Sequence, residues 1–240
     1  MVTAAILIIG NEILSGKVEE ENAKYMIRGL RKAGVDLKRV TIVRDDIDVI
    51  AQEVRTMSKG HDVVFTSGGV GGTHDDVTMK AVCKALDVEL VQNQEILDMF
   101  SKHYGQNLNN ALLRMTMLPD GAQLVGQHAL RFPSVQVRNI HIFPGVPQFL
   151  RSKFDYVASA LGGIPVEMKT ILLAVGEDKI ARILENTDAE FPEVEIGSYP
   201  RFDVDDFRVK VTLESRKTEA LEKAYEMIIE QLESSWIVQK

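Results

Sequence analysis

The most constraining feature of this 240-residue sequence is a regular alternation between short apolar runs and helical repeats. Thr3–Ile9 is a continuous apolar run that ends at Gly10, as expected for a strand buried on both faces. Val35–Val43 and Asp62–Thr66 show further strand patterns, and helical repeats lie between the strands. Strands that alternate with helices at this spacing predict an α/β fold with a mostly parallel sheet and helices on both faces.

Four helices are predicted from periodicity and from residues that favour helix ends. The first opens with Glu19–Glu21 and closes at Gly34, which suits the helix dipole and a left-handed C-cap. Two more are expected over Asp46–Ser58 and near Asp76–Leu86, and a fourth over Gln148–Ala160. Four helices are enough to cover both faces of the predicted sheet.

Two stretches of this region are harder to assign. Ser134–Phe143 contains two strand segments that are compatible with one bent strand, and Asn93–Val125 allows no assignment beyond a helical start. Leu161–Pro165, with two glycines and a proline, is the best candidate for a linker. We therefore expect a first domain at residues 1–162.

The remaining residues, 166–240, predict a small second domain. Apolar and polar side chains alternate over Phe207–Glu214, as in a strand with one buried face, and Leu221–Leu232 has the spacing of an amphipathic helix. The predicted order, β-α-β-β-α, favours a small α+β domain in which helices cover one face of one sheet.

Composition excludes several classes of protein. Asp and Glu number 35 against 28 Lys and Arg, a net charge of −7, which argues against a nucleic-acid partner. The single cysteine, Cys83, excludes a disulfide framework and a multi-cysteine zinc site. Apolar runs such as Ala4–Ile9 are far shorter than the ~20 residues of a membrane span, and the N-terminal residues do not resemble a secretory signal. We expect a soluble, cytoplasmic protein with no membrane partner.

A glycine-rich loop, Thr66–Thr78, lies between the third predicted strand and the following helix. Glycines let backbone N–H groups approach a ligand, and a helix N-terminus attracts anions such as phosphate. The adjacent carboxylates of Asp75 and Asp76 leave two interpretations open. One is a phosphate or nucleotide site in which a divalent cation bridges carboxylates and phosphates. The other is a tight turn with one aspartate as the helix N-cap.

Known phosphate-binding motifs do not fit the chain. Gly10–Lys17 has five residues between its glycines where a P-loop has four, and Val18 stands where the Mg²⁺-binding hydroxyl is needed. Gly68–Gly72 does not match the dinucleotide-binding fingerprint. Neither a Walker ATPase nor a nicotinamide-dependent oxidoreductase is favoured.

Acidic side chains also follow the first two predicted strands. Glu12 comes after the first and Asp45 after the second. Ligands of open α/β sheets bind outside the carboxyl ends of the strands, so we expect Glu12 and Asp45 to lie near Asp75 and Asp76.

At this level of detail the sequence resembles a known family. Gly10–Gly16, Asn22, Asp45 and Gly68–Thr78 resemble the motifs of MoaB/Mog molybdopterin-binding domains, and Phe143–Pro147 resembles a turn of the CinA branch. The resemblance implies a three-layer α/β core with its site at the glycine loop. It also implies a small phosphorylated ligand, a nucleotide or a pterin, and a homo-oligomeric assembly.

Further segments resemble the molybdopterin-binding-like half of eukaryotic FAD synthase: Leu130–Pro133, Val137–Asn139 and Gly197–Pro200. The CinA branch implies metal-dependent hydrolysis of ADP-ribose, and the FAD synthase half implies hydrolysis of FAD to FMN and AMP. The cofactor implied is a divalent metal: Mg²⁺, Mn²⁺ or Co²⁺. The alternative is a molybdopterin-binding protein of molybdenum cofactor metabolism without pyrophosphatase activity.

The same matching assigns roles to individual residues. Asp45, Asp75 and Asp76 are the expected catalytic residues, and Asp76 and Glu12 the expected metal ligands. The expected ligand-binding residues are Gly10, Glu12, Asn22, Ser67, Gly68, Gly69, Gly71, Thr73, Thr78, Pro144 and Gly145. One departure is Gly72, which stands where the family usually has proline and is expected to loosen the loop.

Overall fold

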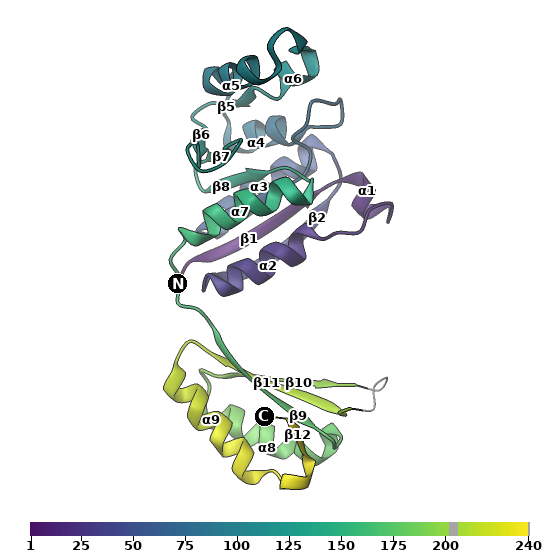
Figure 1. The fold of residues 1–240 in the computed structure, drawn as a ribbon, viewed down its shortest axis with the longest axis vertical. Helices are drawn as coiled ribbons and strands as arrows, with labels where there is room; N and C mark the ends of the chain where they lie inside the picture. Colours follow the sequence, from purple (N-terminus) through teal and green to yellow (C-terminus); the bar gives the residue numbers. More distant parts are fainter. Residues whose placement is uncertain (202–205, 240) are drawn as a thin grey trace. The chain divides into compact units, whose positions relative to one another are not determined.

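A computed structural model of the chain describes residues 1–201 and 206–239 (Figure 1). Contacts divide the chain into two compact units, Met1–Gly163 (unit 1) and Ile164–Lys240 (unit 2). The helices of the described residues are all too short or too polar to cross a membrane.

Unit 1 contains a six-stranded sheet, a two-stranded sheet and the helices around them. Its elements are β1 (Thr3–Ile9), α1 (Asn11–Leu14), α2 (Asn22–Lys32), β2 (Asp36–Val43), α3 (Ile47–Gly60), β3 (Val63–Ser67), α4 (Thr78–Leu86), β4 (Leu90–Gln92), α5 (Gln94–Tyr104), the 3₁₀ turn η1 (Gly105–Asn107), α6 (Asn110–Arg114), β5 (Met117–Pro119), β6 (Gln123–Val125), β7 (Ser134–Val137), β8 (Ile140–Phe143) and α7 (Pro147–Ser159).

The main sheet has the strand order β2-β1-β3-β8-β7-β6. The first four strands are parallel, and β7 and β6 extend the sheet in antiparallel pairing. The prediction of a mostly parallel sheet is therefore confirmed. One bent strand over residues 134–143 is wrong, because Arg138, with φ 52°, reverses the chain and makes β7 and β8 a hairpin.

Two apolar cores lie on opposite faces of this sheet and make unit 1 a three-layer structure. On one face, α3 and α4 pack through Val54, Met57, Ala81 and Val82. On the other, α2 and α7 pack through residues that include Phe154. Figure 1 shows α2 and α7 together on one side of the sheet and α3 behind it. The three-layer prediction is confirmed.

Helix starts differ from the prediction in a way that matters for the site. Helix α4 begins at Thr78, two residues after Asp76, and its N-cap Val77 makes no side-chain capping bond. Neither Asp75 nor Asp76 is therefore the N-cap of this helix, and the interpretation of one aspartate as its cap is wrong. Helix α3, by contrast, is capped as its sequence suggests, since Asp46 accepts from the amides of Asp48 and Val49.

Unit 2 is a small α+β structure with one antiparallel sheet in the order β10-β11-β9-β12. Its elements are β9 (Glu167–Leu173), α8 (Glu177–Glu190), β10 (Glu195–Pro200), β11 (Val209–Ser215), α9 (Thr218–Gln231), the 3₁₀ turn η2 (Ser234–Trp236) and β12 (Ile237–Gln239). Alternate residues of β9 and β11, such as Ile171, Val211 and Leu213, form one core with Ile180 of α8 and Ile228 of α9. Strand β12 has no counterpart in the sequence prediction.

Candidate functional site

The carboxyl ends of β1, β2, β3 and β8 meet at one edge of the parallel sheet, and the predicted site residues follow those ends. Gly10 follows β1, Asp45 lies just after β2, Gly68 follows β3 and Pro144 follows β8. Backbone hydrogen bonds extend the strand pairing past the strand ends. The amide of Gly10 donates to the carbonyl oxygen of Val43 in β2 (3.1 Å), and the amide of Gly68 donates to that of Phe143 in β8 (3.2 Å). The sheet therefore brings the loops of four strands together, as the strand-end argument predicted.

The glycine loop leaves β3 through a backbone conformation that requires glycine. Gly68 has φ +107°, and a Cβ at this position would lie 2.0 Å from the carbonyl oxygen of Ile9. Thr78 then ties the helix to the start of the loop, because its hydroxyl donates to Gly68 O (2.8 Å) and its amide to Gly69 O (3.0 Å). The loop start is thus fixed on both β1 and α4.

Asp76 holds the far half of the loop. Its carboxylate accepts hydrogen bonds from the amides of Gly71 (2.6 Å) and Thr73 (2.8 Å) and from the hydroxyl of Thr73 (2.5 Å). In the described part of the chain, the amides of Gly69, Val70 and Gly72 donate to no protein acceptor. Phosphate oxygens can therefore use those three amides, whereas phosphate binding by the amides of Gly71 and Thr73 stays a prediction and requires displacement of Asp76.

Three more carboxylates come from three different loops at this edge. Asp45 is half-buried and accepts a hydrogen bond from the amide of Asn11 (2.8 Å). Burial raises the pKa of Asp45, and the nearby carboxylates of Glu12 and Asp75 raise it further. Glu12 lies over the end of β1, since a Cβ on Gly10 would be 2.5 Å from its carboxylate. Glu12 and Asp75 therefore lie near enough to Asp45 to act on its pKa, as predicted, whereas the carboxylate of Asp76 is bonded to the loop amides instead.

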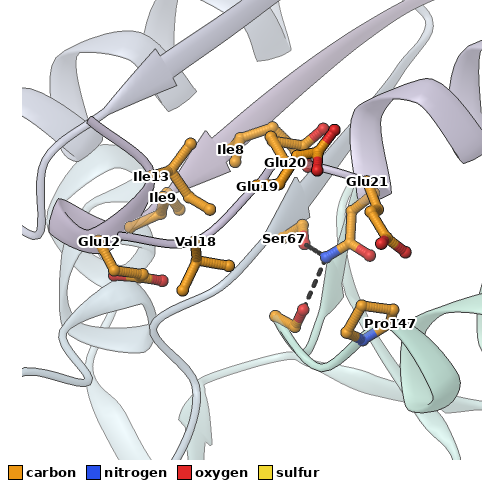
Figure 2. A pocket seen from close by; sticks show the side chains of 12 residues that line it. Ile8, Ile9, Glu12, Ile13, Val18, Glu19, Glu20, Glu21, Ser67 and Pro147 are labelled. Atoms are coloured by element: carbon orange, nitrogen blue, oxygen red, sulfur yellow. Dashed lines mark hydrogen bonds between the residues drawn. The ribbon is translucent and has the colours of Figure 1, made fainter. Parts of the chain in front are cut away.

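A pocket opens beside these groups, on the α2 side of β1 and β3 (Figure 2). In the figure, Glu12 and Val18 lie across from Glu21 and Pro147, with Ser67 between them. Its volume is about 90 Å³. Because small-molecule sites usually enclose roughly 300 Å³ or more, this pocket alone accommodates only part of a dinucleotide.

Asn22, at the start of α2, is buried in the wall of this pocket. Its side-chain N–H groups donate to Ser67 Oγ (3.0 Å) and to Gly145 O (2.7 Å), drawn as dashed lines in Figure 2. A carbonyl oxygen only accepts, so the amide nitrogen must face Gly145. Asn22 Oδ1 is then buried without a hydrogen-bond partner among the described residues. Buried polar atoms are nearly always satisfied, so Oδ1 is suited to a donor from water or from a ligand.

The chemistry of the donors decides whether a divalent metal fits. In residues 1–201 and 206–239, no group of three or more His, Cys, Asp or Glu side chains is arranged to hold a metal ion. A Mg²⁺-like ion, however, is usually held by one or two carboxylates together with substrate oxygens and water. One or two carboxylates from among Glu12, Asp45 and Asp75 would fit that partial role. The carboxylate of Asp76 has roughly four acceptor positions, and three of them already accept hydrogen bonds from the loop. Asp76 therefore has little capacity left to bind a metal ion.

One contact of the loop was missed by the sequence reasoning. Arg114, at the end of α6, donates from Nε (2.9 Å) and Nη2 (2.6 Å) to the carbonyl oxygen of Gly72. Arg114 lies in the stretch that allowed no assignment, and 42 residues separate the partners. No sequence signal connects them.

The fold is a three-layer α/β domain whose candidate site lies at the carboxyl edge of a parallel sheet. Residues 5–181 match the sequence model of the family described as "Probable molybdopterin binding domain". The match covers well over half of the chain, so the protein belongs to this family, which confirms the resemblance. Residues 165–240 match the family described as "FAD synthase, middle domain".

Individual relatives agree with this assignment. A protein of Archaeoglobus fulgidus is 34% identical over 196 residues, which cover 82% of this chain and 85% of that protein. A protein of Caenorhabditis elegans named "Probable FAD synthase" is 32% identical over 250 residues, which cover 92% of this chain and 48% of that protein. This chain spans about half the length of the nematode FAD synthases that it matches.

Among solved structures, the protein CinA from Thermoplasma acidophilum, described as of unknown function, is similar at a TM-score of 0.57 and 29% identity. The similarity covers 62% of this chain and 93% of that one. It confirms the structural relation to CinA.

Proposed function

We propose that the protein is a metal-dependent pyrophosphatase that hydrolyses a dinucleotide, FAD (to FMN and AMP) or ADP-ribose. The observation that carries the proposal is the placement of Glu12 and Asp75 near Asp45, beside a loop in which the amides of Gly69, Val70 and Gly72 donate to no acceptor among the described residues. Carboxylates repel phosphate, so an anionic ligand at this edge requires a cation between them. The similarity to FAD synthases supports a nucleotide as the substrate.

The chain's own residues have separate roles in this proposal. The free amides of Gly69, Val70 and Gly72 hold phosphate oxygens, and Asp76 keeps the loop in shape for them. Asp45 is the candidate general base, because a carboxylate with a raised pKa accepts a proton from water more readily. A bound Mg²⁺, Mn²⁺ or Co²⁺ ion would neutralise phosphate charge and lower the pKa of water.

The test is AMP release from FAD, ADP-ribose or NAD by the purified protein, measured by chromatography with each of the three metal ions. We expect release from FAD or ADP-ribose that stops when the metal is chelated. Asp45→Asn should lower the rate by about 100-fold or more, the usual contribution of a general base. Asp36→Asn is the matched control, because Asp36 begins β2, the strand that Asp45 follows, and is paired with Lys38 far from the site. No AMP from any combination would refute the proposed hydrolysis.

A second candidate is a molybdopterin-binding protein without pyrophosphatase activity. The match of residues 5–181 to a molybdopterin-binding family favours it. Titration with molybdopterin separates the two, since this candidate predicts tight molybdopterin binding and no AMP release from FAD or ADP-ribose.

A further inference from the structure

Arg114 and Asp76 hold the same turn of the glycine loop from two sides. Asp76 accepts from the amides of Gly71 and Thr73, the two neighbours of Gly72. Arg114 donates twice to the carbonyl oxygen of Gly72 itself. A single residue of the loop is therefore fixed through its own carbonyl and through the amides on both sides of it.

The segment that carries Arg114 is well anchored. Asn109 caps α6 by accepting from the amides of Ala111 (3.0 Å) and Leu112 (3.1 Å), and Leu112 packs against the apolar core. Two residues after Arg114, Thr116 is completely buried and its hydroxyl donates to Leu113 O (2.7 Å). Arg114 thus extends from a fixed base, so its guanidinium can restrain the more exposed loop.

The loop also lies in close contact with α6. A Cβ on Gly72 would be 2.4 Å from the carbonyl oxygen of Ala111, a backbone atom that cannot rotate away. Glycine at position 72 therefore allows the carbonyl of the loop to come within reach of Arg114. A larger residue would push the loop away from α6 without removing any charge.

We propose that Arg114 is a positioning residue that holds the glycine loop in its phosphate-binding form by binding the carbonyl of Gly72. The expected effect on ligand binding rests on the proposed function, because Arg114 would position the loop amides that are proposed to bind phosphate. Loss of Arg114 should release residues 69–75, weaken ligand binding and leave the rest of unit 1 folded.

Two variants test the role from opposite sides. Arg114→Ala removes the guanidinium, and Gly72→Ala keeps it but separates the loop from α6. Hydrogen exchange should become about tenfold faster in both at the amides of Gly71 and Thr73, the effect of roughly one hydrogen bond. Arg55→Ala is the matched control, because Arg55 binds the carbonyls of Lys84 and Ala85 at the other end of α4. It should leave loop exchange unchanged.

Binding and turnover give the second readout. Both loop variants should raise the KM for FAD, or the Kd for inorganic pyrophosphate with Mg²⁺, by about tenfold, with a smaller change in kcat. Added guanidinium ion at millimolar concentration should partly restore Arg114→Ala. If Arg114 supplied only charge, Arg114→Ala would weaken pyrophosphate binding while hydrogen exchange at Gly71 and Thr73 stayed at the wild-type rate.

Unchanged loop exchange in Arg114→Ala would overturn the inference. If instead the wild-type protein releases no AMP, the proposed hydrolysis fails, and the exchange measurement still decides the role of Arg114.

Discussion

Gly68→Ala is the substitution that most directly tests the geometry at the start of the loop. A non-glycine residue at φ +107° is strained by about 1–3 kcal/mol. The new Cβ would also overlap the carbonyl oxygen of Ile9 at 2.0 Å, and relief of an overlap with backbone costs about another 1–3 kcal/mol. We expect a loss of about 4 kcal/mol in unit 1, which lowers the Tm of a domain of this size by about 12 °C.

Substitutions at two other glycines distinguish the cost of backbone strain from the cost of steric overlap. Gly16 also has a positive φ, +69°, but apart from its chain neighbours no atom of the described residues lies within 4 Å of its Cβ position, so Gly16→Ala should cost only about 1 kcal/mol. Gly60→Ala, with neither feature in helix α3, should cost nothing.

Differential scanning calorimetry measures the Tm of the three variants. The single tryptophan, Trp236, packs in the core of unit 2, so its fluorescence follows the unfolding of that unit as an internal reference. A Tm for Gly68→Ala within about 3 °C of that for Gly16→Ala would show that the overlap with Ile9 carries no energetic weight.

Three further substitutions test other parts of unit 1. Burial lowers the pKa of His141 to about 4 from 6.5. As the pH falls, the unfolded chain therefore takes up a proton at His141 before the native chain does. The free energy of unfolding should fall by about 3 kcal/mol between pH 6.5 and pH 4. Urea unfolding of His141→Gln should show no such dependence of the unfolding free energy on pH. Asn139 joins the β7–β8 turn to the end of α3 through bonds to Ser58 and His61, so Asn139→Ala should cost about 3 kcal/mol in the same assay. The helix-capping bonds of Asp46 lower its pKa, so the Tm deficit of Asp46→Ala should be largest at neutral pH and shrink as the pH falls below 3.8.

Much of the fold follows from local patterns. Thr3–Ile9 is a strand with the predicted bounds, and α3 begins at Ile47, one residue after its predicted start at Asp46. The hairpin of β7 and β8 was not recognised, because it depends on one residue, Arg138, taking a positive φ that its side chain does not favour. Strand β12 was missed because three residues at the edge of a sheet are too few to show a period.

The site divides in the same way. The carboxyl-edge placement of Glu12, Asp45 and the glycine loop follows from strand–helix alternation, which makes neighbouring strands parallel. The hydrogen bonds of Asp76 do not follow, because its partners are chosen by how the loop folds back on itself.

Gly72 shows the difference most clearly. The sequence alone predicts a loosened loop at this position, where the family usually has proline. In the tertiary structure, the absence of a side chain lets Gly72 pack against Ala111 and accept two bonds from Arg114.

The sequence by itself indicated helices on both faces of a mostly parallel sheet and the sheet edge at which the candidate site lies. Periodicity and turn residues act between near neighbours, so they can be recognised along the chain. Only the tertiary structure decided the hydrogen-bond partners of Asp76, the loop amides that make no bond among the described residues, and the contact of Arg114 with Gly72. Those contacts join residues from separate loops, and their distances depend on the packing of the whole sheet and its helices.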